Sequence, residues 1–171
     1  MEITTPEPRS LEPHPPAGVR PEQQVSAAWQ AHGRAVMRFA TALVGPHDAH
    51  DVATNAFLRV VRQPGWNDIE HLDRYWMRAV RHEAQNLSRE RQRRWQRDLH
   101  AVTSRSTTDA VADPDVIRAI GRLSVQQRAV VFLAYWHQMT EAEIADTLDL
   151  ARSTVHRNLI RARIQLRKAL R

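Results

Sequence analysis

Apolar residues recur at helical spacing along most of the chain. In segment 23–44 they fall every three or four residues, and Gly45 with Pro46 ends the pattern. A second run, 47–62, stops at Pro64 and Gly65, and a third extends over 71–99. The alternation typical of a half-buried strand is missing from the sequence. The pattern therefore predicts an all-α protein.

The second half continues in shorter helices, predicted over 115–122 and 125–137. Ser124 is placed to cap the second of these, and Thr140 to cap a helix that starts directly after it. Glu143 lies three residues beyond Thr140, as a capping box requires. The tryptophans that fall on apolar helical faces are expected in the core: Trp29, Trp76 and Trp136.

The last predicted helix has one apolar stripe and otherwise basic faces, with no acidic residue from 151 to the end. Asp149 and Leu150 form a tight turn before it, and the small Ala145 lets the helix on the other side of the turn cross closely. These proportions predict a helix-turn-helix whose second helix enters the major groove of DNA. The residues placed for base or phosphate contacts are Arg152, Ser153, Thr154, His156, Arg157, Asn158 and Arg161.

Composition divides the chain into four parts. Proline and charge dominate 1–21, which is expected to be a flexible tail, and 22–99 forms the first helical domain. Serine, threonine and aspartate fill 100–112, as in a flexible linker, and 113–171 forms the second domain. The fold class expected is all-α, with two small helical domains.

The charge and the cysteine content narrow the range of possible functions. The net charge of +6 and a pI near 11.0 favour an anionic partner such as nucleic acid. With no cysteine, the chain has neither disulfides nor thiolate metal sites. No signal peptide or membrane-spanning stretch is recognisable, so we expect a soluble cytoplasmic protein with no membrane insertion.

Three segments of the second half, in order and without a gap, match motifs of a known family. Residues 123–133 are similar to its "L-P-x-x-x-R-x-V-x-x-L" helix, 139–145 to "L-S-x-x-E-I-A", and 153–163 to "G-T-V-K-S-R-L-x-R-A-R". From 23 to its end, the chain resembles a bacterial RNA polymerase sigma factor of the sigma-70 family, extracytoplasmic-function (ECF) type. Sigma factors of the ECF type keep only the second and fourth sigma domains.

The resemblance implies roles for the first domain as well. Segment 48–60 resembles the helix that docks on the polymerase clamp, which implicates Asp48, Asp51, Asn55, Leu58 and Arg59. Segment 75–81 resembles the helix that engages the minus-ten element. The residues implied in minus-ten recognition and melting are Trp66, Asn67, Asp68, Arg78, Arg81, Arg89 and Arg93.

The resemblance implies that the protein directs promoter-specific transcription initiation. It implies no catalytic activity and no cofactor for the protein itself. The expected partners are core RNA polymerase and promoter DNA. The polymerase would be bound at its β′ clamp and β flap, and the recognition helix would bind the minus-thirty-five element of the promoter. Family members are commonly held inactive by an anti-sigma protein, which is a further expected partner.

The sequence departs from the family at three places. Thr54 and Asn55 stand where the clamp-binding helix usually has Gln-Glu, which removes a charge expected to help docking. Glu83 stands where asparagine is common, and the acid either faces DNA or turns elsewhere. His156, Arg157 and Asn158 replace Lys-Ser-Arg, so the target sequence cannot be carried over from relatives.

Two other functions compete with this interpretation. A stand-alone regulator would bind DNA through the helix-turn-helix without polymerase. A metal-dependent phosphohydrolase would use His47, His50 and Asp51 on one helical face, but would need further ligands from other helices. The remaining histidines do not form a matching pattern, and no metal site is predicted.

Overall fold

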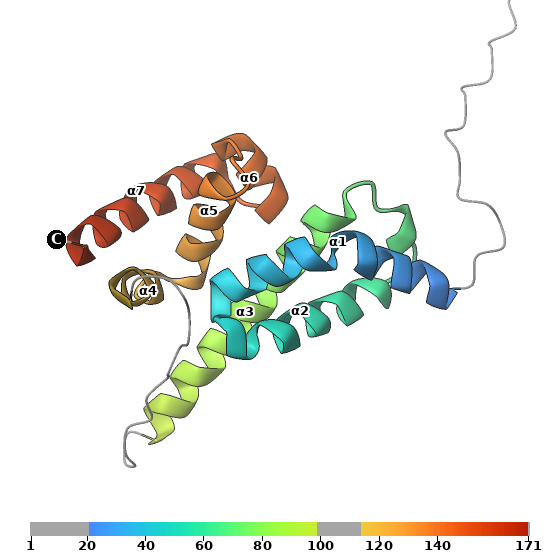
Figure 1. Cartoon of the computed structure of the whole chain (residues 1–171), viewed down its shortest axis with the longest axis horizontal. Coiled ribbons are helices and arrows are strands. Elements are labelled where there is room, and N and C mark those ends of the chain that lie inside the picture. Colours follow the sequence, from blue (N-terminus) through green and yellow to red (C-terminus); the bar gives the residue numbers. More distant parts are fainter. Residues whose placement is uncertain (1–20, 99–113, 171) are drawn as a thin grey trace, which may run out of the picture.

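The computed structural model describes residues 21–98 and 114–170, and these are helical apart from short turns (Figure 1). The all-α prediction is confirmed for this part of the chain, which contains no strand. The predicted tail, apart from Pro21, and the predicted linker lie outside the described residues.

The first group of helices packs around one apolar centre. It consists of α1 (Pro21–Val44), α2 (Pro46–Val61), the short 3-10 helix η1 (Trp66–Asp68) and α3 (Leu72–Asp98). Gly45 separates α1 from α2 with a φ of 84°, a conformation that glycine adopts without strain. In the centre, the Trp76 ring lies 4.5 Å from that of Phe57 and 5.2 Å from that of Trp29. This aromatic cluster joins all three long helices.

The second group consists of α4 (Pro114–Gly121), α5 (Val125–Tyr135), α6 (Glu141–Leu148) and α7 (Arg152–Ala169). Both predicted caps are confirmed, because Ser124 forms a capping box with Gln127 and Thr140 forms one with Glu143. Hydrogen bonds from the Thr140 backbone and hydroxyl lower the pKa of Glu143. The helix-turn-helix therefore begins where the sequence predicts.

One core prediction is wrong. Trp29 and Trp76 pack into the core, but Trp136 is 73% exposed. α5 ends at Tyr135, two residues earlier than predicted, and Trp136 stacks on the Phe132 ring at 5.9 Å on the outer surface. The helical face that would bury Trp136 does not extend that far.

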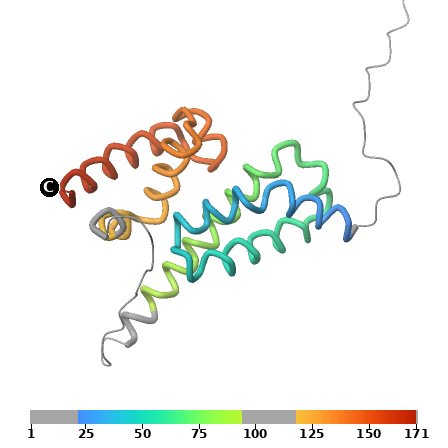
Figure 2. Tube along the Cα trace, viewed as in Figure 1, coloured from blue at the N-terminus to red at the C-terminus, as the bar shows by residue number. Residues whose placement is uncertain are grey.

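The two groups of helices lie directly against each other (Figure 2). α1 and α3 contact α5, and α3 also contacts α6. The Phe39 ring of α1 lies 5.7 Å from the Phe132 ring of α5, and the buried apolar residues of both groups form one continuous cluster. Figure 1 shows α3 extending beyond α1 and α2 at its C-terminal end.

Candidate nucleic-acid interface

The first turns of α7 present the residues predicted to contact DNA. Of these, Thr154 and Asn158 are half-buried, and the others are exposed: Arg152, Ser153, His156, Arg157 and Arg161. The opposite face of α7 buries Val155, Leu159 and Ala162 against the second group. Helical spacing in the sequence also predicts Leu166 and Leu170 on this apolar stripe. Leu166 is half-buried, whereas Leu170 lies beyond the helix end and is exposed.

Local contacts orient the polar side chains of this face. Arg157 donates from Nε to the Ser153 carbonyl at 3.3 Å and from Nη2 to the Thr154 hydroxyl at 3.3 Å. Asn158 donates to the Thr154 carbonyl at 2.7 Å. Across the turn, His156 Nδ1 lies 2.9 Å from a carboxylate oxygen of Glu141 in α6. The exposed face of α7 is therefore basic, and intramolecular contacts already hold some of its polar side chains in place.

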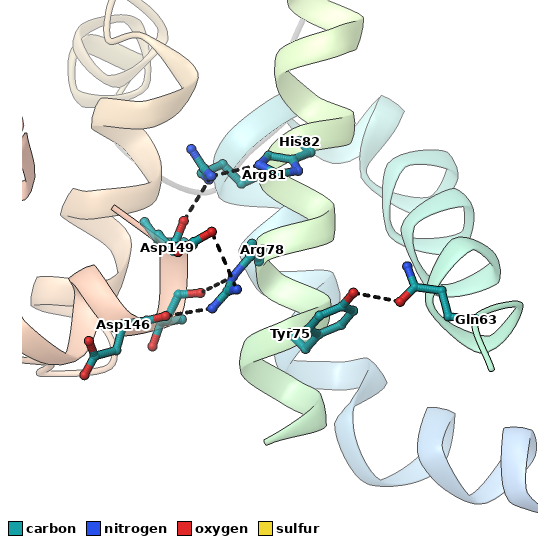
Figure 3. Close-up of polar contacts among 9 residues, drawn as sticks. Gln63, Tyr75, Arg78, Arg81, His82, Asp146 and Asp149 are labelled. Carbon is teal, nitrogen blue, oxygen red and sulfur yellow. Dashed lines mark hydrogen bonds and ion pairs between the residues drawn. The ribbon is translucent and has the colours of Figure 1, made fainter. Parts of the chain in front are cut away.

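Two of the predicted minus-ten arginines point into the other group of helices (Figure 3). Arg78 donates to the Asp146 carbonyl at 2.8 Å and to the Thr147 carbonyl at 3.4 Å. Arg81 donates to the Leu148 carbonyl at 3.0 Å. These carbonyls are at the C-terminal end of α6, where helical carbonyls lack partners and carry partial negative charge.

Burial and neighbouring charges lower the pKa values of Arg81 and His82, which lie beside Arg78. Arg81 is only 5% exposed, and its burial, with Arg78 nearby, lowers its pKa while Asp149 opposes the shift. Its Nη2 lies 2.9 Å from His82 Nε2, so that ring nitrogen accepts and the imidazole is neutral. Burial lowers the pKa of His82, and the charges of Arg81, Arg78 and Arg59 lower it further.

The loop before α3 is anchored by a tyrosine. The Tyr75 hydroxyl donates to Gln63 Oε1 at 2.7 Å (Figure 3). Beside this bond is a cavity of about 180 Å³ lined by Arg59, Val60, Gln63, Tyr75, Arg78, Ala79 and His82. Trp66 packs partly against the core, whereas Asn67 and Asp68 are exposed.

The remaining predicted residues lie on α2 and the outer part of α3. Arg89 and Arg93 are exposed, as are Asp51, Asn55, Leu58 and Arg59. Asp48 is instead largely covered, because both of its carboxylate oxygens accept from Arg91 at 2.7 Å. Glu83 pairs with Arg59 of α2, with 2.5 Å between oxygen and nitrogen.

An open apolar groove of about 870 Å³ runs between the two groups on another face. Its floor includes Leu123, Phe132 and Trp136, and arginines border it: Arg38, Arg128, Arg163 and Arg167. Arg163 also donates to the Tyr135 hydroxyl at 2.9 Å. The groove has the apolar floor and basic edge that suit an amphipathic helix with acidic residues.

Residues 115–166 match the family model described as sigma-70, region 4. Over this segment the chain is similar to region 4 of sigma-70 proteins. The matched segment contains the capping box of α6 and the exposed basic face of α7. The resemblance inferred from the motifs of this segment is thereby confirmed.

The fold of the chain has a counterpart among solved structures. It is similar to the sigma factor RpoE from Bartonella quintana, solved in complex with the anti-sigma factor NepR, with a TM-score of 0.67 and 21% identity. The match covers 85% of this chain and 95% of that chain, so the shared fold includes both groups of helices. No curated protein matches the chain in sequence.

The three residues of the metal-enzyme alternative, His47, His50 and Asp51, lie exposed on α2. Within residues 21–98 and 114–170, no three or more His, Asp or Glu side chains are grouped to hold a metal ion. In the same residues, no helix is long and apolar enough to cross a membrane.

Sequence reasoning missed the residues that join the two groups of helices. Arg128 of α5 donates to the Leu43 carbonyl at the end of α1, and burial lowers its pKa. The Asp149 carboxylate lies 3.8 Å from Arg78. Asp149 has a φ of 53°, a left-handed conformation that asparagine and aspartate tolerate at helix ends. Only its place in a turn was visible in the sequence.

Proposed function

We propose that this protein is a sigma factor of the ECF type, which binds core RNA polymerase and directs promoter-specific transcription initiation. The observation that carries the proposal is the exposed basic face of α7, from Arg152 to Arg161, within a segment that matches sigma-70 region 4. In this proposal the protein has no catalytic residue and needs no cofactor. We also propose that it acts in the cytoplasm.

The first turns of α7 would read the minus-thirty-five element in the major groove. Arginine is suited to this because its planar fork pairs with O6 and N7 of guanine. Arg157 is already oriented by Ser153 and Thr154, which lowers the entropy lost on binding a base. Ser153 and Arg152, at the helix N-terminus, would contact phosphates.

The first group of helices would capture the minus-ten element. The 180 Å³ cavity beside Tyr75 is also bordered by Arg59, so it offers an aromatic ring and a cationic group to an unstacked base. Exposed Asn67 and Asp68 are at the neighbouring loop, and Arg89 and Arg93 continue the basic surface along α3. Arg78 and Arg81 would join this surface once they leave α6.

Two surfaces would bind polymerase. On α2, Leu58 is 40% exposed beside Arg59 and Asn55, which supports a docking site for the β′ clamp. The part of the apolar groove that α5 and α7 form, at Phe132, Trp136, Arg163 and Arg167, would accept a helix of the β flap. An anti-sigma protein, such as the one bound to the Bartonella quintana relative, would compete for these surfaces.

The experiment that tests the proposal is run-off transcription with core polymerase and genomic promoter fragments. We expect discrete transcripts when the full-length chain is added and none with core alone. A stand-alone regulator would bind the DNA but yield no transcript and fail to co-purify with core polymerase.

A matched pair of variants makes the test specific. Leu58→Asp places a charge on the proposed clamp surface and should abolish co-purification with core polymerase. Ile164→Asp places the same charge at an exposed apolar position of α7 and should leave co-purification intact. Equal effects of the two substitutions would contradict the assignment of α2 to the clamp.

A further inference from the structure

A carboxylate of α6 holds a histidine on the exposed face of α7. His156 Nδ1 lies 2.9 Å from Oε1 of Glu141, which is in the first turn of α6. An ionised carboxylate can only accept a hydrogen bond, so Nδ1 carries a proton and donates it to Glu141. The contact thus settles which of the two ring nitrogens is protonated when the imidazole is neutral.

The capping box of α6 leaves Glu141 for this contact. The other acid of the first turn, Glu143, accepts from the Thr140 backbone at 2.7 Å and from its hydroxyl at 2.8 Å. The same box fixes the start of α6, and Glu141 is the first residue of the helix. The position of the carboxylate that meets His156 is therefore set by the fold of the helix-turn-helix.

The hydrogen bond to Glu141 decides what the second ring nitrogen can bind. With the proton on Nδ1, Nε2 of the neutral ring carries a lone pair and can only accept. The His156 side chain is 57% exposed, and no other described residue forms a hydrogen bond with its ring, so Nε2 is open to a ligand. In the major groove it would accept from N6 of adenine or N4 of cytosine, which are the amino groups displayed there.

This acceptor is the reverse of what its neighbours offer. Arg152, Arg157 and Arg161 are exposed on the same turns and have donors only, which suit guanine and phosphate oxygens. The family motif has lysine at the position of His156, and an ammonium group is also a donor only. An acceptor among donors changes the class of base favoured at one position and leaves the phosphate contacts of the arginines unaltered.

We propose that Glu141 is a positioning residue for promoter recognition. It holds the His156 ring with Nε2 as an acceptor, so that the chain selects adenine or cytosine over guanine or thymine at one position of the minus-thirty-five element. This role rests on the proposed function, and it adds a residue outside α7 and the class of base that α7 selects.

The protonation of the ring is measured in the free chain, without polymerase or DNA. Nitrogen-15 NMR of the chain labelled in histidine distinguishes a protonated ring nitrogen from an unprotonated one, and the spectrum of His156→Ala identifies the signals. At mildly alkaline pH, where neutral imidazole prevails, we expect the proton on Nδ1. Glu141→Gln should shift the signals toward the other tautomer, because an amide can donate as well as accept. A proton on Nε2 in the unmodified chain would overturn the proposal.

Base preference is measured by footprinting the complex with core polymerase on promoters that differ at single base pairs of the minus-thirty-five element. We expect one position at which replacing adenine or cytosine by guanine or thymine on the same strand weakens binding about three- to tenfold. Glu141→Gln should reduce this preference, and His156→Lys should reverse it. Asp146→Asn removes a charge from an exposed position of the same helix and should leave the preference unchanged.

The outcomes separate this role from a merely structural contact. An unchanged preference in Glu141→Gln, or equal effects of Glu141→Gln and Asp146→Asn, would overturn the proposal. So would a preference for guanine or thymine that disappears in His156→Ala. If the unmodified chain gives no footprint, the proposed function fails and base selection by His156 fails with it, whereas the NMR result still decides whether Glu141 holds the ring.

Discussion

The indole nitrogen of Trp76 in α3 donates a hydrogen bond to the Ala53 carbonyl of α2, 3.2 Å away. Trp76 is fully buried, and its ring packs on Phe57 and Trp29. One side chain thus supplies both apolar contact and a polar connection between two helices that must keep their relative orientation.

Trp76→Phe should therefore destabilise the fold by about 1 to 3 kcal/mol, because the hydrogen bond is lost and the smaller ring leaves a cavity. Trp76→Ala should cost about 3 to 5 kcal/mol. Denaturant unfolding measures both. Trp136→Phe is the control, since its side chain is exposed and its replacement should change stability by less than about 0.5 kcal/mol. Equal losses at Trp76 and Trp136 would contradict the placement of these rings.

Glu83→Gln removes the carboxylate that pairs with Arg59 across α2 and α3. The glutamate side chain is 16% exposed and that of the arginine 57%, so the pair is intermediate between buried and surface ion pairs. We expect a loss of about 1 to 2 kcal/mol in unfolding free energy. The exposed Glu70→Gln in the same group of helices should cost less than about 0.5 kcal/mol. Thermal unfolding compares the two.

Arg157→Ala should weaken promoter binding by roughly 1 to 3 kcal/mol and relax preference at one base pair, because a bidentate contact with guanine is lost. Arg163→Ala removes the same charge from the same helix, but Arg163 contacts Tyr135 beside the groove. It should leave base preference unchanged. Footprinting with the polymerase complex, over a set of single-base variants of the promoter, distinguishes the two. An identical preference in both variants would argue against Arg157 in the groove.

Stability should fall as pH drops below about 6.5, in part because of His82. Its pKa is lowered in the folded state by burial and by Arg81, Arg78 and Arg59, and Asp149 opposes the shift. The unfolded chain therefore binds more protons just below pH 6.5, so folding gains stability as pH rises through that window and levels off above it. Protonation would also remove the acceptor that faces Arg81.

Unfolding free energies at several pH values between 5 and 8 provide the test. His82→Gln should flatten the acid side of the curve. An unaltered slope in His82→Gln would show that its environment is not the one described.

The candidate site could be predicted only in part. The exposed face of α7 follows from helical spacing and from the lack of acids after 150, and every residue predicted there lies at that face. The partners of the α3 arginines could not be predicted. Arg81 and the Leu148 carbonyl are 67 residues apart in sequence, and no local pattern signals such a contact.

The sequence alone determined the features that depend on neighbours within a few residues. Helical periodicity, the cap at Ser124 and the capping box at Thr140 indicated the helices and their starts, because capping and amphipathic spacing act over one or two turns. Only the tertiary structure decided that Glu83 pairs with Arg59, that Trp136 is exposed, and that Arg78 and Arg81 cover the end of α6. These outcomes depend on which distant surfaces meet, and a free guanidinium or carboxylate takes whichever partner the packing brings within reach.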